Sequence, residues 1–309
     1  MPELPEVETV RRGLALWLPG KKIKEVEVLH PRATNPRSIA PLSHAQGARI
    51  EGVHRRGKFL WFRLNRPYVL LAHLGMSGQF LITPRSEILS THTRVRLRTN
   101  DRRREVRFID QRTFGWISVD TLINDAPTSI AHIAFDIFDS RCDIDGVIRS
   151  IRKRTTSIKS ALLNQDIMSG VGNIYADESL WRAKIHPERA ANSLSVQEIG
   201  HVLTSAQEVM SEALEAGGTS FDDLYINVNG ESGYFDRALS VYGQEGEPCP
   251  RCRSMIRRIA FANRSSHFCP TCQRRPRGKA RKKGRKRAKS VKRTHLDRKS
   301  TRLNSSHRT

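Results

Sequence analysis

The sequence predicts an α+β protein in which a helix leads into an antiparallel β-sandwich, followed by a helical region and a cysteine-rich segment. Three observations favour this order. Short apolar and aromatic runs fill residues 21–119, apolar residues recur at helical spacing over 144–216, and four of the five cysteines lie within 249–272. We therefore divide the chain into residues 1–125, 126–143, 144–243, 244–273 and 274–309.

Residues 5–18 are expected to form the leading helix. Four apolar residues fall on one face at helical spacing, namely Val7, Val10, Leu14 and Trp17. Arg11 and Arg12 lie off that face, and Pro19 with Gly20 ends the helix.

Short strands are expected next, because aromatic and aliphatic runs alternate with turn residues. The clearest runs are residues 58–64, 68–73, 79–82, 93–98 and 105–109. Thr99–Asp101 is interpreted as a hairpin turn between the last two. Several short antiparallel strands in one region favour a β-sandwich over an α/β fold.

A mixed segment, residues 126–143, is interpreted as the linker to a second domain. Helices are then expected to begin near Asp145, Ser157, Ile174 and Ser195. Residues 217–219 end this run, and the Gly- and Asn-rich stretch after it is expected to be a loop.

The net charge of +23 indicates a polyanionic partner. Residues 274–309 carry 17 of the 54 lysines and arginines and a single acid, so this tail is expected to be disordered. Residues 297–307 resemble a translated sequencing adapter, and we leave them out of functional reasoning. With neither a membrane-spanning apolar run nor a secretory signal, the protein is expected to be soluble and cytoplasmic.

The cysteine spacing predicts a metal site. Cys249 with Cys252 and Cys269 with Cys272 form two CxxC pairs separated by sixteen residues. Two such pairs complete a closed tetrahedral Zn²⁺ site, whose structural role follows from the lack of an open coordination position. A redox role for either pair ranks below zinc. The arginines between the pairs suit a nucleic-acid contact.

Motifs spread along the chain resemble those of formamidopyrimidine-DNA glycosylase. They are Met1–Thr9, Arg56–Phe59, His73–Gly78, Asp110–Gly115, Val171–Glu178, Gly233–Phe235 and the four-cysteine segment. The resemblance covers residues 1 to 275 in order. It implies a helix–two-turn–helix domain, a β-hairpin zinc finger and a monomeric enzyme of base excision repair. Such an enzyme removes oxidised purines from double-stranded DNA and cleaves abasic sites.

The resemblance assigns the chemistry to four residues. Once Met1 is removed, Pro2 carries a terminal secondary amine, and a terminal amine with a pKa of about 8 can attack C1′ and form a Schiff base. Glu3 would protonate the opened sugar oxygen. Lys58 is assigned to β-elimination and a phosphate contact. Arg264 is assigned to a phosphate clamp and δ-elimination, of which the clamp suits an arginine better.

The same resemblance supplies residues for DNA contact. Phosphate or base contacts are implied for His92, Arg112, Arg154, Lys159 and Asn173. The void left by an everted base would be filled by Met76, Arg112 and Phe114. Glu6 and Tyr234 are expected at the base pocket, and residues 227–235 correspond to a lid. Thr113 stands where many relatives have a second arginine, which we expect to be tolerated.

Three alternatives remain open at this stage. One is the related oxidised-pyrimidine glycosylase, endonuclease VIII, although Leu4 and the His73–Gly78 motif favour the purine branch. Another is a non-catalytic damaged-DNA-binding module, against which Pro2, Glu3 and Lys58 argue. A generic zinc-ribbon protein would leave the first 240 residues unexplained.

Overall fold

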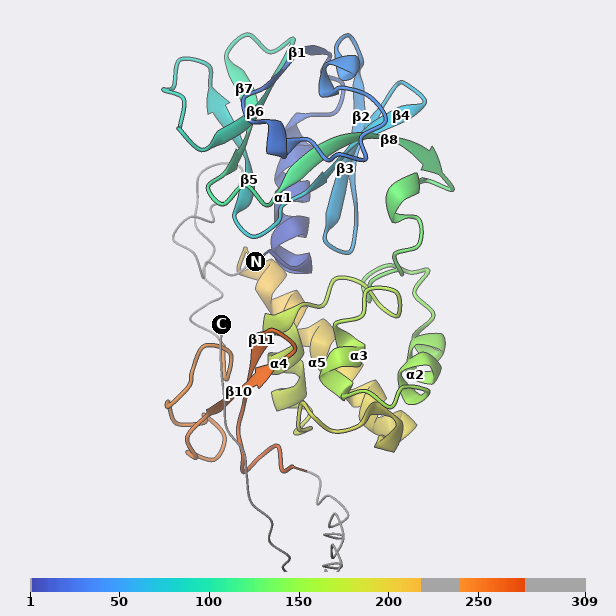
Figure 1. Cartoon of the computed structure of the whole chain (residues 1–309), viewed down its shortest axis with the longest axis vertical. Helices are drawn as coiled ribbons and strands as arrows, with labels where there is room; N and C mark the ends of the chain where they lie inside the picture. Colours follow the sequence, from blue (N-terminus) through green and yellow to red (C-terminus); the bar gives the residue numbers. More distant parts are fainter. Residues whose placement is uncertain (1, 218–238, 276–309) are drawn as a thin grey trace, which may run out of the picture. The chain divides into compact units, whose positions relative to one another are not determined.

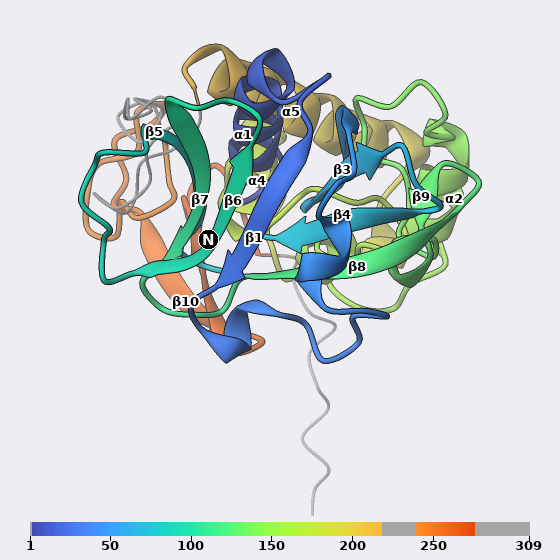
Figure 2. The ribbon, with the colours of Figure 1, turned by 90° about the horizontal axis from the view of Figure 1, so that it is seen from above.

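The computed structural model describes residues 2–217 and 239–275, and two antiparallel sheets fill its N-terminal part (Figure 1). One sheet has the order β1-β6-β7-β5 and the other β2-β3-β4-β8-β9. Figure 2 shows the two sheets face to face. Their strands are β1 (Ile23–Val28), β2 (Ile50–Arg56), β3 (Phe59–Leu64), β4 (Tyr68–His73), β5 (Gly78–Pro84), β6 (Thr93–Thr99), β7 (Arg104–Asp110), β8 (Trp116–Ile123) and β9 (Ala126–Pro127).

The predicted sandwich is confirmed, and the five predicted strands correspond to β3 through β7. The hairpin predicted around residues 99–101 joins β6 to β7, with Leu97 opposite Val106. Four strands, β1, β2, β8 and β9, were not delimited from the sequence. The last of these, Ala126–Pro127, pairs with β8 inside the segment expected to be a linker.

Helix α1 (Leu4–Trp17) connects two hydrophobic cores. Its residues Val7, Val10 and Leu14 pack among the strands of both sheets and are fully buried. Leu4, one turn earlier, belongs instead to the core of the helical part. The chain's first residues are therefore held at the boundary between sandwich and helices, where Figure 1 places the N-terminus.

The helical part contains α2 (Ile144–Arg152), α3 (Ile158–Leu162), α4 (Asn173–Arg182) and α5 (Val196–Glu215). Their starts agree with the predicted positions, and Ser157 and Ser195 accept hydrogen bonds from the first turns of α3 and α5 as N-caps. None of the helices in residues 2–217 and 239–275 has the length and apolar character of a membrane span. Short 3₁₀ turns occupy Pro31–Ala33, Leu42–Ala45, Thr128–Ile130 and Ala191–Ser193.

The cysteine-rich segment forms a hairpin of β10 (Arg257–Phe261) and β11 (Arg264–Phe268). Ala262 and Asn263 connect the strands with φ of 42° and 60°. Two consecutive residues with positive φ form the tight turn that matches strand twist. Arg264 is therefore fixed at the tip of a short hairpin.

A cluster of charges ties α1 to the sandwich and to the segment that follows it. Glu8 accepts hydrogen bonds from Arg11 at 2.9 Å and from Arg55 at 3.0 Å. Arg55 also donates to Asp136 at 2.8 Å. Although burial opposes ionisation of Glu8, the hydrogen bonds and charges of Arg11 and Arg55 lower its pKa to about 2.

Replacing Glu8 with glutamine is expected to destabilise the protein in a pH-dependent way. Because the folded pKa lies below the unfolded value, the carboxylate contributes stability above pH ~4.5 that is lost as the pH falls toward 2. We expect a loss of about 2 kcal/mol at pH 7, allowing for solvent screening, and less than half of it near pH ~3. Urea unfolding across this range measures it. A difference independent of pH would contradict the ion-pair interpretation, and Glu51→Gln, on an exposed carboxylate, is the control.

Candidate active site

The first helical turn of the chain is packed against the start of α4. The Glu3 carboxylate accepts backbone N–H groups of Gly172 at 2.8 Å, Ile174 at 2.9 Å and Tyr175 at 3.4 Å. These are N–H groups that a helix N-terminus leaves without internal partners. Glu3 is only 1% exposed, so the residue next to Pro2 is held rigidly and away from bulk water.

Glu6 also holds the first turn of α1 in place. Its carboxylate accepts the backbone N–H of Glu3 at 2.8 Å and the hydroxyl of Tyr175 at 2.7 Å. Glu6 and Tyr175 are both buried. The structure thus brings Glu6 directly beside Glu3, and this contact orients the backbone that follows Pro2.

Lys58 lies on the other side of Glu3, in the turn between β2 and β3. Its ammonium group donates to the Val171 carbonyl at 3.0 Å. Burial lowers the pKa of Lys58, with a smaller opposing effect from Glu3 and a further lowering by Arg264. Burial conversely raises the pKa of Glu3, against the opposing effects of Lys58 and the Ile174 N–H. Both shifts bring these groups closer to proton exchange near neutral pH.

The finger hairpin is docked on α4 beside this site. Asp177 is buried and accepts the Ser266 hydroxyl at 2.7 Å and the His267 backbone N–H at 2.8 Å. The Asn173 amide donates to the Ser265 carbonyl at 3.0 Å. These contacts hold the residues just after Arg264, whose own side chain is exposed.

The expectation that Lys159 contacts DNA phosphate needs correction. Lys159 is fully buried, with its ammonium group 2.7 Å from Asp177 and donating to the Ser265 carbonyl at 3.1 Å. A buried lysine needs such partners to offset its desolvation. Lys159 therefore links α3, α4 and the finger inside the protein, and its ammonium group is already held by two partners.

Two loops carry the residues expected to fill the void. Asp110, fully buried at the end of β7, accepts the Ser77 hydroxyl at 2.6 Å and the backbone N–H groups of Arg112 at 3.1 Å and Gly115 at 2.6 Å. A Cβ on Gly75 would lie 2.5 Å from the Gly115 nitrogen, so the two loops touch backbone to backbone.

Between the bonds to Asp110, the second loop projects outward. Phe114 is 56% exposed, and the Arg112 guanidinium lies 5.4 Å from its ring centre. Met76 on the first loop is half-buried. Thr113 has φ of 55°, an unusual conformation for a β-branched residue.

The remaining predicted contacts are less closely grouped. The His92 carbonyl accepts the Asp110 backbone N–H at 2.9 Å, which attaches His92 to the same loops. Arg154 is exposed after α2, and among the described residues its side chain makes no ion pair. Tyr234, the lid at 227–235 and most of the tail, including 297–307, lie outside the described residues.

The four predicted zinc ligands come together. The sulfur atoms of Cys249, Cys252, Cys269 and Cys272 all lie within 4.8 Å of one another. Tetrahedral Zn–S bonds of about 2.3 Å place thiolates about 3.8 Å apart, so the cluster fits one structural Zn²⁺ ion. The Trp181 indole N–H donates to the Cys249 sulfur at 3.4 Å, which connects α4 to the ligand set.

Several residues that organise the site had no role assigned from the sequence. Asp110 and Tyr175 lie within quoted motifs, but nothing in their spacing shows that they are buried hubs. Gly172 is the clearest case, because a Cβ there would lie 2.6 Å from one Glu3 carboxylate oxygen and overlap the other carboxyl atoms. A glycine directly before a predicted helix is the signal that could have found it.

A rigid N-terminal Pro-Glu pair beside a half-buried lysine, on a β-sandwich joined to helices and a four-cysteine finger, defines a zinc-finger DNA glycosylase. Comparison with known families is specific. Profiles described as the formamidopyrimidine-DNA glycosylase N-terminal domain, its H2TH domain and the zinc finger found in FPG and IleRS match residues 1–117, 133–224 and 246–275. The chain belongs to the formamidopyrimidine-DNA glycosylase family.

Individual relatives are similar to this chain over nearly their whole length. Formamidopyrimidine-DNA glycosylase of Nocardioides sp. is 53% identical, over 90% of this chain and 96% of its own. That of Salinispora arenicola is 51% identical, over 90% and 98%. The crystal structure of the Thermus thermophilus protein has a TM-score of 0.78 at 37% identity, covering 88% of this chain and 98% of its own. A Lactococcus lactis complex with DNA containing an abasic site has a TM-score of 0.79 at 33% identity, covering 89% and 100%.

Replacing Gly172 with alanine is expected to lower the rate of base excision about a hundredfold, because the new methyl group must displace the Glu3 carboxylate. The φ of Gly172, −123°, is accessible to alanine, so the effect is steric and not a matter of backbone strain. Single-turnover excision measures it. Gly200→Ala in α5, where a Cβ meets nothing within 4 Å, should leave the rate unchanged. Equal rates for the two variants would contradict the proposed place of Glu3 in the chemistry.

Proposed function

We propose that this chain is a bifunctional DNA glycosylase and abasic-site lyase of base excision repair that removes oxidised purines, 8-oxoguanine and formamidopyrimidines among them. The observation that carries the proposal is the buried Pro2–Glu3 start, held against the N-terminus of α4 with Lys58 beside it. DNA bound in solved relatives supports the same substrates. Lactococcus lactis structures contain Fapy-dG DNA or an abasic site, and a structure of MutM contains carbocyclic 8-oxo-G DNA.

In the proposed reaction the free amine of Pro2 attacks C1′ of the damaged nucleotide. The bond from C1′ to the base breaks, and the base leaves with the bonding electrons. Glu3 protonates the sugar ring oxygen as the ring opens, and the nitrogen–carbon double bond of a Schiff base forms. The raised pKa of Glu3 supports this role, because the group keeps a transferable proton at a higher pH than an ordinary glutamate does.

Elimination then follows from the Schiff base, which acidifies the adjacent carbon. Lys58, with its lowered pKa, is the proposed base for β-elimination, in which the 3′ phosphate leaves with its electrons. Arg264 would hold a phosphate during δ-elimination at the 5′ side. Its exposed guanidinium at the hairpin tip supports this role.

DNA contacts are proposed for His92, Arg112, Arg154 and Asn173, with Met76, Arg112 and Phe114 entering the void. The exposed Phe114 and the Asp110-anchored loops support the second assignment, because an inserted side chain must keep its position against base stacking. The finger carries one structural Zn²⁺. A cytoplasmic site of action near the nucleoid fits the bacterial relatives.

Borohydride trapping tests the proposed function. Duplexes with 8-oxoguanine should give a covalent protein–DNA adduct, and duplexes with an oxidised pyrimidine should give much less. An adduct on the pyrimidine duplex alone would support the endonuclease VIII type of specificity instead. No adduct on either, with binding intact, would indicate a non-catalytic damaged-DNA-binding module.

A further inference from the structure

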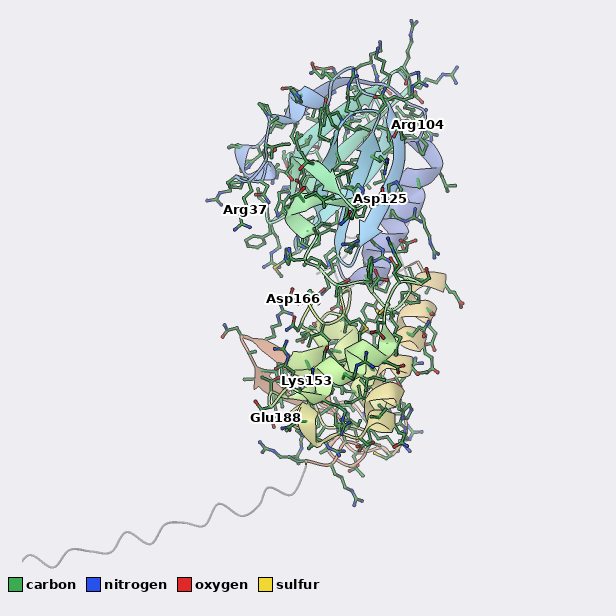
Figure 3. All side chains as sticks on the ribbon, turned by 90° about the vertical axis from the view of Figure 1, so that its right-hand side faces the viewer. Arg37, Arg104, Asp125, Lys153, Asp166 and Glu188 are labelled. Carbon is green, nitrogen blue, oxygen red and sulfur yellow. The ribbon has the colours of Figure 1, made fainter. Side chains whose placement is uncertain are left out.

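A basic cavity lies beside the β2–β3 turn and shares no lining residue with the site above. Its volume is about 550 Å³, which is within the range of small-molecule pockets. Its lining includes five arginines and two acids, Glu8 and Asp125. Asp125, labelled in Figure 3, marks its rim on the sandwich.

Four of the five arginines have carboxylate partners. Arg11 and Arg55 share Glu8, and Arg55 also reaches Asp136. Arg63 lies 3.1 Å from Asp125, and Arg141 lies 2.7 Å from Asp139. These carboxylates offset much of the positive charge of the four arginines, and the pairs of Arg63 and Arg141 are partly exposed to solvent.

Arg56 is the exception. It is 9% exposed, and within the described part of the chain its side chain makes no hydrogen bond or ion pair. Its guanidinium lies 4.5 Å from the Phe135 ring centre, and that of Arg141 lies 4.4 Å from the same ring. Burial, followed by the charge of Arg141, lowers the pKa of Arg56 against smaller opposing effects of Asp139 and Asp136.

An arginine remains protonated in proteins, and the Arg56 nitrogen atoms reach solvent, because none of them is among the side-chain atoms that are buried without a partner. The cavity therefore has one guanidinium whose five donors are open to a ligand, surrounded by arginines already fixed by other bonds. Planar guanidinium donors suit a phosphate or carboxylate oxygen pair.

The remaining lining adds an aromatic surface. His54 stacks on Trp61 with ring centres 5.7 Å apart, and both residues line the cavity. Burial, followed by the charges of Arg63 and Arg11, lowers the pKa of His54, so the ring stays neutral at pH 7. A neutral stacked pair beside a guanidinium is the arrangement that holds a flat ring attached to an anion.

We propose that this cavity binds a phosphate monoester the size of a mononucleotide, with the phosphate on Arg56 and the flat ring near His54. The cavity is lined by none of the residues proposed to contact DNA, and its proposed ligand does not depend on the proposed glycosylase activity. Because Arg56 directly precedes the turn that carries Lys58, an occupied cavity is also placed to affect the position of Lys58.

Isothermal titration calorimetry of the full chain with adenosine 5′-monophosphate tests the proposal. The titration is repeated with adenosine, with inorganic phosphate and with protein saturated by a duplex containing a tetrahydrofuran abasic analogue. We expect the monophosphate to bind more tightly than either fragment and to bind the DNA-saturated protein equally well. Loss of binding on DNA saturation would show that the monophosphate occupies the phosphate sites of the DNA surface, and would overturn the proposal.

Substitutions locate the site. Arg56→Gln should weaken monophosphate binding about tenfold or more, since charge-assisted hydrogen bonds are lost without creating a buried unpaired charge. Arg104→Gln, an exposed arginine labelled elsewhere on the sandwich in Figure 3, removes the same net charge and should leave the affinity unchanged. Equal weakening by both variants, or none by Arg56→Gln with its thermal unfolding unaltered, would overturn the proposal. Inorganic phosphate binding as tightly as the monophosphate would overturn its nucleotide part.

Discussion

Replacing Pro2 with glycine is expected to reduce borohydride trapping on 8-oxoguanine duplexes by about a hundredfold or more. Glycine still provides a terminal amine, so the loss tests position and amine type and not the mere presence of nitrogen. The proline ring prevents rotation about the bond between the amine nitrogen and Cα, whereas the amine of a terminal glycine rotates freely. A displacement of about 1 Å from the attacking geometry is enough for a loss of this size.

The surroundings of Pro2 explain why position matters here. Pro2 is buried, and the next residue is fixed by the bonds of Glu3 to α4 and to Glu6. Because the backbone after Pro2 is held in place and the proline ring restricts the nitrogen, the amine lone pair points in one direction. A glycine would lose only the constraint from the ring. Binding to undamaged DNA should therefore stay nearly unchanged.

Pro67→Gly, in the exposed turn between β3 and β4, is the matched control and should trap as the unaltered chain does. Mass spectrometry must first show that Met1 is absent from each sample, because a retained Met1 would remove the nucleophile from both. Unchanged trapping by a Met1-free Pro2→Gly protein would show that another group is the nucleophile.

The fold was predictable where a periodic pattern coincided with one buried face. Strand β6 alternates buried and half-buried residues over its whole length, and it was found from its alternating arginines. Strand β1 alternates less regularly and carries lysine and glutamate, while β2 contains a glycine and two arginines. Their strand character comes from pairing: β1 pairs with β6, whose residues lie 67 to 76 positions away, and β2 pairs with β3, whose residues lie 3 to 14 positions away. For β1, no local pattern contains that information.

The residues of the active site were also predictable only where a local sequence pattern was sufficient. Four cysteines at CxxC spacing were enough to predict the zinc ligands, because two thiolates at this spacing can bind the same metal ion. The assignment of Pro2 depended on family resemblance, since a second-position proline has no reactive side chain. Lys159 was assigned wrongly for a physical reason, because its partners Asp177 and Ser265 meet it only after the helices and finger have packed together.

Removing zinc is expected to unfold the finger while the sandwich and helices stay folded. The core around Cys249, Cys269 and Ile256 is a small cluster separate from the large cores of the other two parts. So small a core does not stabilise a domain alone, and structural zinc contributes on the order of 10–16 kcal/mol to folding of comparable fingers. We therefore expect near-native circular dichroism from the rest of the chain together with changed emission from Trp181, whose indole donates to Cys249.

DNA affinity should fall at least about tenfold after zinc removal, because the charge-assisted phosphate contacts proposed for Arg264 depend on the finger. Unfolding of β11 would release the Ser265 carbonyl and the Ser266 hydroxyl, leaving Lys159 and Asp177 with fewer partners at the start of α4. The rate of base excision from DNA that is already bound should therefore fall as well. Cys269→Ser should reproduce both effects, while Cys142→Ser, outside the ligand set, should reproduce neither. Full DNA affinity in a protein verified to be zinc-free would contradict the view that the metal holds Arg264 in place.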